Sequence, residues 1–372
     1  MSDSGSDTVI MTLDAGGTSF RFSALRGSSA VTPVVTMPSQ GHDLGLCLEN
    51  MVKGFEQIRS VCPAEPAAIS FAFPAPADYP RGIIGDLYNL PGFRGGIALG
   101  PMLRERFQVP VFINNDGDLF AYGEASSGFL PYVNGLLEAA GSTKRYRNLL
   151  GVTLGTGFGG GIVRNGDLFL GDNSMAGEIW QLRHKLDPRV NVEEGASIRA
   201  VRRVYAEEAG IPAAQAPDPR VIAQIATGEA PGNRAAAAQA YRRMGEVVGD
   251  ALATALALVD GLVVVGGGLS NAHRLFLPAV VRELNSSYVP PGGAERRRLE
   301  TEVFNLEDGD QLARFVAGNP CEVTVPLGGA RIRYDRQSRL GVGISRLGTS
   351  RAIALGAYAF ALRALSESGR AA

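Results

Sequence analysis

Three glycine clusters, each placed directly after an apolar run that predicts a β-strand, constrain this chain more than any other feature. The runs Thr8–Leu13, Leu149–Leu154 and Leu262–Val265 lead into the clusters Asp14-Ala-Gly-Gly-Thr18, Gly155-Thr-Gly-Phe-Gly-Gly-Gly161 and Gly266-Gly-Gly268. Glycine permits close approach of the backbone, and successive N–H groups in such turns converge on anionic oxygens. The pattern therefore predicts a cleft that binds phosphate groups.

One glycine cluster alone would be explained equally well by a flexible turn, because glycine turns are common. Three clusters after successive strands disfavour that reading. None of them is a P-loop, since no Lys-Ser or Lys-Thr pair follows, and none has the strand-turn-helix spacing of a dinucleotide fingerprint. The clusters therefore indicate a phosphate site of a different kind.

The pattern between the clusters predicts an α/β layered fold built from two similar halves. The first two clusters tip β-hairpins, because the strands Phe20–Leu25 and Ile162–Arg164 follow them. Further apolar strands alternate with helical patterns, at Ala68–Phe73, Val111–Asn114, Leu44–Ser60, Gly96–Phe107, Ala196–Ala209 and Asn233–Val259. We expect an N-terminal domain over 1–124 that is joined by a C-terminal helix over 350–372, and a second domain over 125–349.

Residues 287–339 interrupt this pattern with Pro290-Pro-Gly-Gly293, a charged run, and the β-like segments Glu322–Val325 and Ala330–Tyr334. We interpret this stretch as an insertion that forms a partly β appendage on the second domain. A subunit contact and a solvated decoration are the two roles open to it.

Composition excludes several classes of protein. The 372 residues are 45% hydrophobic and 20% charged, which is typical of a globular chain and not of a disordered one. A net charge of −1 gives no general attraction for nucleic acid or an anionic membrane, so an anionic ligand needs a local site. Sparse cysteines without a CxxC pair, and an acidic start that does not resemble a signal peptide, predict a cytoplasmic protein.

Two acidic residues are candidates for chemistry. Asp14 lies at the first glycine tip, where a carboxylate beside phosphate needs an intervening cation, and this indicates Mg²⁺. Asp116 belongs to Asn114-Asn-Asp-Gly-Asp118, directly after the strand Val111–Ile113. Because α/β proteins bind ligands at the carboxyl ends of their strands, Asp116 is a candidate general base. The alternatives are an Asx-turn for Asp14 and a helix N-cap for Asp116.

The ordered set of motifs resembles the ROK family (repressor, open reading frame, kinase) within the actin-like ATPase superfamily of sugar kinases. The matching segments are Asp14-Ala-Gly-Gly-Thr-Ser-Phe-Arg21, Asn89-Leu-Pro-Gly-Phe93, Asn115-Asp-Gly-Asp-Leu-Phe-Ala-Tyr-Gly-Glu124, Gly155-Thr-Gly-Phe-Gly-Gly-Gly161, Ala176-Gly-Glu178 and Val264-Val-Gly-Gly-Gly268. In the same order, they are similar to the family's first phosphate motif, its NLPGW segment, its NDAN…GE motif, its second phosphate hairpin, the AGE of its AGExGH motif and its adenosine-side loop. The resemblance implies two actin-like domains of ribonuclease H type with a cleft between them.

The resemblance also implies ATP-dependent phosphorylation of a hexose, usually at the 6-hydroxyl, with Asp116 as the base. It places the sugar on Asn89, Asn115, Glu178, Gln181 and Glu193. It places ATP on Asp14, Gly16, Gly17, Thr18, Arg21, Gly155, Thr156, Gly157, Gly266, Gly267 and Gly268. Mg²⁺ is expected near Asp14, held through water, and the chain is expected to be a homodimer whose partner is a small-molecule sugar.

The chain departs from the family where kinases carry AGExGH and then a zinc cluster, CxCGxxGC. The segment reads Ala176-Gly-Glu-Ile-Trp-Gln181, and no cysteine lies between Cys62 and Cys321, so we expect no zinc. Glu193 still fits the family's CLExxAS, although Asn191 replaces its cysteine. We expect His184 to be a surface or hydrogen-bonded residue and not a ligand, and Trp180 either to pack or to stack on the sugar.

A cytoplasmic glucose kinase is the first hypothesis. Fructose, mannose and an N-acetylhexosamine are alternative substrates, and we expect the Trp180 ring to disfavour the acetamido group. A sugar-sensing regulator is disfavoured because the first motif begins near residue 12, which leaves no room for a helix-turn-helix before it. A non-catalytic sugar binder is disfavoured because Asp116 and all three glycine loops are present.

Overall fold

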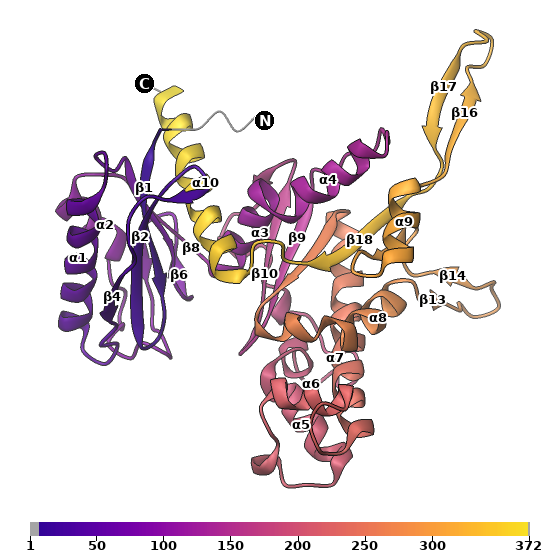
Figure 1. Cartoon of the computed structure of the whole chain (residues 1–372), viewed down its shortest axis with the longest axis horizontal. Helices are drawn as coiled ribbons and strands as arrows, with labels where there is room; N and C mark the ends of the chain where they lie inside the picture. Colours follow the sequence, from indigo (N-terminus) through magenta and orange to yellow (C-terminus); the bar gives the residue numbers. More distant parts are fainter. Residues whose placement is uncertain (1–6, 371–372) are drawn as a thin grey trace. The chain divides into compact units, whose positions relative to one another are not determined.

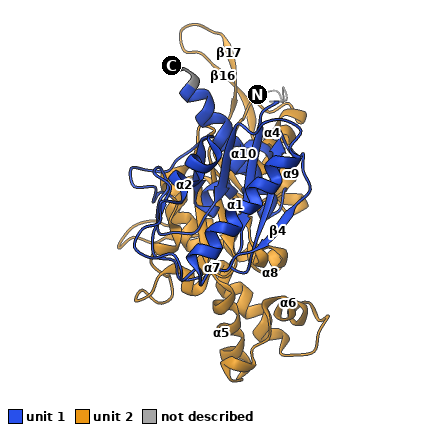
Figure 2. Cartoon of the chain, turned by 90° about the vertical axis from the view of Figure 1, so that its left-hand side faces the viewer, with its two compact units in different colours: residues 1–127, 167–176, 347–372 blue, residues 128–166, 177–346 orange. Residues whose placement is uncertain are grey.

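The structure is a computed structural model that describes residues 7–370, and it divides into two compact units (Figure 2). Unit 1 comprises residues 1–127, 167–176 and 347–372. Unit 2 comprises residues 128–166 and 177–346. Each unit is a mixed α/β structure built on its own sheet, and we describe the two units separately.

Unit 1 is built on a sheet of strand order β3-β2-β1-β5-β8, with β4 paired to β2. These strands are β1 (Val9–Ala15), β2 (Ser19–Arg26), β3 (Ser29–Ala30), β4 (Val35–Pro38), β5 (Ala68–Ala72) and β8 (Val111–Asn114). The remaining elements are α1 (Leu44–Val61), β6 (Ala77–Asp78), β7 (Ile83–Ile84), α2 (Leu99–Phe107), α3 (Asp116–Ser127), β11 (Asp167–Leu168) and α10 (Thr349–Arg370). Alternate residues of β1 serve opposite faces: Met11 and Leu13 join the core under α1, and Ile10 joins a core with α10.

Helices α3 and α10 cross in close contact, and glycine permits it. A Cβ at Gly123 would lie 1.9 Å from the carbonyl oxygen of Ala352, and a Cβ at Gly356 would lie 1.9 Å from that of Leu119. The Ser70 hydroxyl on β5 donates to the carbonyl oxygen of Ala357 at 2.7 Å. This crossing fixes α3, the helix that begins with Asp116, against the sheet.

Unit 2 is built on strands in the order β10-β9-β12-β18-β15, in which β9, β12, β18 and β15 are parallel. These strands are β9 (Leu149–Leu154), β10 (Phe158–Arg164), β12 (Leu262–Gly266), β15 (Glu302–Asn305) and β18 (Arg339–Ile344). The helices are α4 (Phe129–Ala139), α5 (Ile198–Ala209), α6 (Pro219–Thr227), α7 (Arg234–Val259), α8 (His273–Leu284) and α9 (Gly309–Ala317). Short 3-10 turns are η1 (Ile179–Gln181), η2 (Val192–Gly195), η3 (Ala213–Gln215) and η4 (Gly268–Ala272).

The stretch 287–339 is only partly the appendage that its sequence predicts. Strand β15 pairs with β18 inside the main sheet, and Val303 and Phe304 are buried in the core. Two hairpins of this stretch extend outward from unit 2 (Figure 1): β13 (Ser287–Tyr288) with β14 (Arg296–Arg297), and β16 (Pro320–Thr324) with β17 (Arg331–Asp335). Within residues 7–370, no helix has the length and apolar character that crossing a membrane demands.

Candidate functional site

The first glycine tip joins β1 to β2 in unit 1 and is held in place by the end of β4. Asp14 lies opposite Arg21 in the antiparallel register, and the Gly16 amide donates to the Ser19 carbonyl at 3.0 Å. Ser39 bonds the tip twice, with its hydroxyl to Gly17 O at 2.6 Å and its amide to Thr18 O at 3.1 Å. Asp14, Gly17 and Thr18 remain exposed, so the tip is hydrogen-bonded to the chain after β4 and open to a ligand.

Asn115 and Asp116 lie at the carboxyl edge of the unit 1 sheet, where β8 ends and α3 begins. The Gly117 amide donates to Asn115 Oδ1 at 2.7 Å and to Asp116 Oδ1 at 2.8 Å. The two side chains thus sit at the positive end of α3. Strands β1, β5 and β8 are parallel neighbours, so Asp14 and Asp116 lie at the same edge, separated by β5.

The Asp116 carboxyl has the properties of a proton acceptor. The surrounding protein weakens its solvation and raises its pKa above the ordinary value of 3.8, while the bond from Gly117 acts in the opposite direction. The residue nevertheless keeps surface exposed to solvent. A carboxylate that is reachable and more basic than usual suits general base catalysis.

Asn89 lies on a loop that packs at this same edge. Leu90 and Phe93 anchor the loop in the unit 1 core, and Asn89 itself is exposed. The Phe93 ring centroid lies 5.4 Å from that of Phe73, and the Phe73 amide donates to Asn114 O at 3.0 Å. The loop therefore brings Asn89 toward the end of β8 that precedes Asp116.

The second glycine tip, in unit 2, is shorter than the sequence predicts. Strand β10 already begins at Phe158, so only Gly155–Gly157 form the turn and Gly159–Gly161 belong to the strand. Glu193 and Arg199 brace this turn from outside the hairpin. Glu193 Oε2 accepts from the Phe158 amide at 3.0 Å, and the Arg199 guanidinium contacts Glu193 Oε1 at 2.8 Å and Thr156 O at 3.2 Å.

This bracing gives Glu193 a structural contact that its expected role as a sugar ligand does not include. A Cβ at Gly157 would lie 2.5 Å from Glu193 Oε2, so the carboxylate occupies the space that glycine leaves. A carboxylate has further acceptor sites beyond these two bonds. Its part in sugar binding stays a prediction.

Glu178 is held beside β10 by close glycine packing and by Trp180. Gly177 has φ +85° and packs on the Gly161 backbone, where a Cβ would lie 3.0 Å from Gly161 Cα. The Trp180 indole N–H donates to a carboxylate oxygen of Glu178. Gln181 follows and is exposed. Trp180 thus has a polar contact in addition to its packing.

The third glycine cluster lies next to the second in unit 2. Gly266 pairs with Thr153 in the parallel register of β12 and β9, and Gly267 has φ +85°. A Cβ at Gly267 would lie 2.2 Å from the Leu154 carbonyl oxygen, so only glycine fits here. The two clusters therefore meet at the carboxyl ends of adjacent parallel strands.

A cavity of about 830 Å³ opens beside the third cluster, within the size range of small-molecule sites. Helix α6 and the segment from η4 into α8 line it, with Pro219, Ala223, Gln224, Gly268, Asn271 and His273 among the lining residues. The sequence pattern identifies only the glycines here. The helical lining residues cannot be predicted from the sequence, because residues that line a cavity share no characteristic composition or spacing.

The segment between Gln181 and Glu193 is organised by hydrogen bonds where family kinases carry zinc. His184 is buried, and its Nδ1 accepts from the amides of Leu186 and Asp187, each at 3.0 Å. The His184 amide donates to Val190 O at 3.1 Å, which closes the loop. His184 therefore belongs to the hydrogen-bonded alternative that the sequence leaves open.

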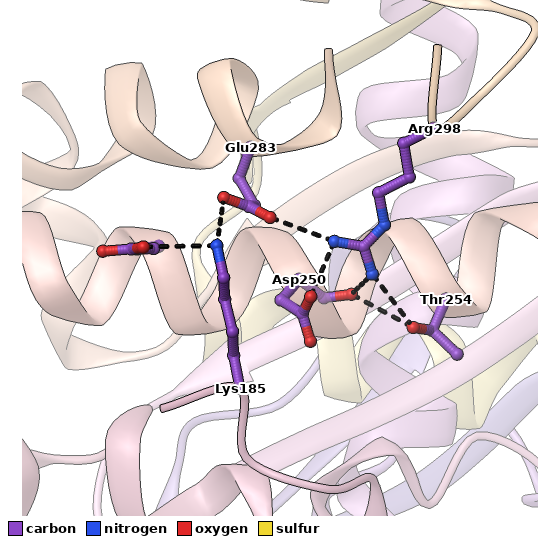
Figure 3. A network of polar contacts seen from close by, with 6 residues as sticks. Lys185, Asp250, Thr254, Glu283 and Arg298 are labelled. Atoms are coloured by element: carbon purple, nitrogen blue, oxygen red, sulfur yellow. Dashed lines mark hydrogen bonds and ion pairs between the residues drawn. The ribbon is translucent and has the colours of Figure 1, made fainter. Parts of the chain in front are cut away.

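An ion-pair network fastens this loop to the rest of unit 2 (Figure 3). Lys185 Nζ contacts Glu246 of α7 at 3.2 Å and Glu283 of α8 at 2.7 Å. Arg298 contacts Glu283 at 3.0 Å and Asp250 of α7 at 2.6 Å. Among the described residues, no group of three or more His, Cys, Asp or Glu is arranged to hold a metal. The segment does not fit zinc, and zinc-free folding stays a prediction.

The stability of unit 2 should fall as pH drops through 6.5, because His184 must be neutral to accept two amide bonds. Burial lowers the His184 pKa from 6.5, and Arg203 lowers it further. Such a group stabilises the fold above pH 6.5 and loses that contribution as pH falls toward the lowered value. Urea unfolding of wild type and His184→Asn, at about pH 7.5 and about pH 5.5, measures the effect.

Asparagine offers a similar acceptor that does not titrate. His184→Asn should therefore be less stable at the higher pH by about 1 kcal/mol but lose less stability on acidification. Equal losses in the two proteins would exclude His184 as the titrating group.

The α/β units, with glycine tips and a carboxylate at strand ends, define a fold of the actin-like type. The ROK family model matches residues 10–296, and the chain belongs to the ROK family. A glucokinase of Halalkalibacterium halodurans is 30% identical over 182 residues, which cover 47% of this chain and 49% of that protein. An N-acetyl-D-glucosamine kinase of Photobacterium profundum is 30% identical over 208 residues, which cover 50% of this chain and 61% of that protein. The chain thus spans about half to three fifths of these relatives.

Solved structures confirm the fold. A glucokinase of Parabacteroides distasonis is 52% identical and superposes with a TM-score of 0.88. The superposition covers 96% of this chain and 98% of that one. A ROK glucokinase of Streptomyces griseus, in complex with glucose and AMPPNP, superposes with a TM-score of 0.58 at 17% identity. That superposition covers 94% of this chain and 98% of that one. The predicted α/β fold and family resemblance are therefore confirmed.

Proposed function

We propose that this chain is an ATP-dependent sugar kinase that transfers the γ-phosphoryl group to a hexose, with the 6-hydroxyl of glucose as the acceptor. The observation that carries the proposal is Asp116. It is an exposed carboxyl of raised pKa at the start of α3, on the same sheet edge as the glycine tip that bears Asp14. Identity to the Parabacteroides distasonis glucokinase supports the substrate.

The chemistry follows from the residues. The sugar hydroxyl oxygen bonds to the γ-phosphorus while Asp116 accepts the proton of that hydroxyl. At the same time the bond between the γ-phosphorus and the β–γ bridging oxygen breaks, and ADP leaves. Backbone amides of the glycine tips stabilise the negative charge of the phosphate oxygens. Asp14 would hold Mg²⁺ through water, and the ion would neutralise phosphate charge. The carboxylate at an exposed tip fits such a cation.

Each half of the nucleotide has a candidate site. The glycines of the three tips would bind the phosphates, with Arg21 and Thr18 beside the first tip. The cavity beside Gly268 would hold adenosine, between α6 and the start of α8. Its size and its position at the carboxyl ends of parallel strands support this assignment.

The deciding experiment is an ADP-release assay with Mg-ATP against glucose, mannose, fructose, N-acetylglucosamine and N-acetylmannosamine. We expect glucose to give the highest kcat/KM and NMR of the product to show phosphate on the 6-oxygen. A preferred acetamido sugar would assign the chain to the second candidate, an N-acetylhexosamine kinase, which the relatives of that name favour. No ADP release with any sugar would contradict the kinase.

Trp180 should set the preference between glucose and N-acetylglucosamine. A large ring next to Glu178 narrows the end of the site that would face the sugar C1 and C2, and a rigid wall rejects added volume sharply. Wild type should prefer glucose, and Trp180→Gly should reduce that preference by about 10-fold. The ratio of kcat/KM for the two sugars is the measurement.

Trp180→Phe separates the ring from its N–H. It keeps the wall but removes the donor to Glu178, so KM should rise for both sugars while their ratio stays near the wild-type value. An unchanged ratio in Trp180→Gly would contradict a specificity role for the ring.

We also propose a homodimer, with the sugar as the small-molecule partner.

A further inference from the structure

The segment 182–191 of unit 2 joins two short turns that carry proposed sugar ligands. Gln181 ends η1 and Glu193 lies in η2, so the segment, which we call the connecting loop, begins and ends beside them. Its two arms are paired, since Arg183 and Asn191 form an antiparallel β-bridge. The course of this loop therefore determines how Gln181 and Glu193 are placed relative to each other.

Lys185 lies in the turn of the connecting loop and ties it to two helices. Its Nζ contacts Glu283 of α8 at 2.7 Å and Glu246 of α7 at 3.2 Å (Figure 3). Burial lowers the pKa of Lys185, but the hydrogen bonds to the two glutamates outweigh burial and raise the pKa above its usual value of 10.5. The loop is therefore held by a side chain that stays charged.

Glu283 is shared between Lys185 and a second cation, Arg298, which comes from the stretch 287–339. Lys185 contacts Oε2 of Glu283, whereas Arg298 contacts Oε1 at 3.0 Å. Arg298 also contacts Asp250 Oδ1 of α7 at 2.6 Å and donates to the Asp250 carbonyl oxygen at 3.0 Å. The side chains of Arg298, Glu283 and Asp250 are 12%, 13% and 22% exposed. Water therefore replaces these contacts poorly if one partner is lost.

We propose that Arg298, through Glu283, holds Lys185 and the connecting loop in the conformation that binds the sugar. Each carboxylate oxygen of Glu283 contacts its own cation, so the carboxylate cannot rotate without losing at least one of the two contacts. Arg298 is thus a positioning residue, and the stretch 287–339 supplies it. This role rests on the proposed kinase function for the identity of the ligand.

Glu283→Gln breaks the shared contact with little risk to the fold. The network has two cations, Lys185 and Arg298, and three carboxylates, Glu246, Asp250 and Glu283. Loss of one carboxylate charge leaves two charges of each sign, with Lys185 still beside Glu246 and Arg298 still beside Asp250. The glutamine oxygen accepts from one cation, but the amide nitrogen is a donor and cannot bond to the other.

The sugar KM should rise roughly 10-fold in Glu283→Gln and in Arg298→Met, while the ATP KM and kcat change by no more than a few-fold. A loosened loop misplaces groups that bind the sugar. Glu193 is also held from outside the loop by Arg199, so the glycine tip that Glu193 braces should keep its shape. An ADP-release assay with each substrate varied in turn gives the two KM values.

Arg296→Met is the matched control for Arg298→Met. Arg296 lies on the same strand, β14, and is exposed and outside the network, so removal of its charge should leave the sugar KM unchanged. Arg298→Lys should recover part of the loss, because lysine keeps the charge but not the planar fork. An effect of Arg296→Met equal to that of Arg298→Met would make net charge the cause and would overturn the positioning role.

A double variant tests the order of the contacts. If Arg298 acts through Lys185, then Lys185→Met combined with Arg298→Met should have the same sugar KM as Lys185→Met alone. Thermal unfolding first establishes that each variant is folded at the assay temperature. Increases in KM that multiply in the double variant would mean that the two cations act separately, and the proposed order would be wrong.

Trp180 gives a measurement that needs no kinase activity. It is the single tryptophan of the chain and lies in η1, directly before the connecting loop. Quenching of its fluorescence by acrylamide, without sugar, should increase in Glu283→Gln and in Arg298→Met but not in Arg296→Met. If quenching increases in a chain that phosphorylates no sugar, the kinase proposal fails while the hold of Arg298 on the loop stands. Quenching equal to wild type, or an unchanged sugar KM in both variants of an active kinase, would overturn the positioning role.

Discussion

Asp116→Asn should lower kcat by roughly 10²–10⁴-fold while sugar affinity changes by no more than a few-fold. The amide has nearly the shape of the carboxylate but cannot accept the proton as charge develops on the sugar oxygen. The Gly117 amide can still bond to the side-chain oxygen, so the start of α3 should keep its geometry. An ADP-release assay measures turnover.

Sugar binding can be followed in the same variant through Trp180, the single tryptophan of the chain, which contacts Glu178. Titration of its fluorescence with sugar should give closely similar affinities for wild type and Asp116→Asn. Asp78→Asn, an exposed carboxyl paired with Arg81, is the matched control and should leave kcat unchanged. A kcat within a few-fold of wild type for Asp116→Asn would remove Asp116 from the mechanism.

The pH dependence provides an independent check on this base. Because the Asp116 pKa is raised, its carboxylate is lost at a higher pH than an ordinary aspartate, and wild-type kcat should fall as pH drops through that raised value. The residual activity of Asp116→Asn should lack this acidic limb. An identical acidic limb in both proteins would assign it to another group.

Glycine spacing and strand-like runs predict much of the architecture because they report on local backbone requirements. Gly267 is an example: its φ of +85° and its contact with Leu154 leave no room for a side chain, and this need is visible in the sequence. Strand β15 is the opposite case. Val303 and Phe304 are flanked by charged and polar residues, and their burial comes from pairing with β18, more than thirty residues away.

The candidate site shows the same division. Asp116 follows an apolar strand and can be located from that position alone. The bond from the Phe158 amide to Glu193 joins β10 to the η2 turn across 35 positions of the chain, and no local pattern encodes it. His184 likewise looks like an isolated histidine until the loop closes around it. Side-chain partners set by tertiary packing are what the sequence could not reveal.

Gly123→Ala should destabilise unit 1 by about 3 kcal/mol or more, the upper end of what overpacking costs. The added Cβ would lie 1.9 Å from the Ala352 carbonyl oxygen, which is backbone and cannot rotate away as a side chain could. The helices would have to separate, yet Gly356 makes the reciprocal contact with Leu119 and Ser70 bonds to α10. Thermal and urea unfolding measure the loss.

Gly135→Ala in α4 is the matched control, because nothing lies within 4 Å of the position that its Cβ would take. There alanine should stabilise the helix by about 0.8–1.0 kcal/mol, so the same substitution changes stability in opposite directions at the two sites. The kinase activity of Gly123→Ala should also fall, since α3 begins with Asp116 and any shift of that helix moves the base. A Gly123→Ala protein as stable as wild type would mean that α3 and α10 are not in backbone contact, and the position of Asp116 would then need another explanation.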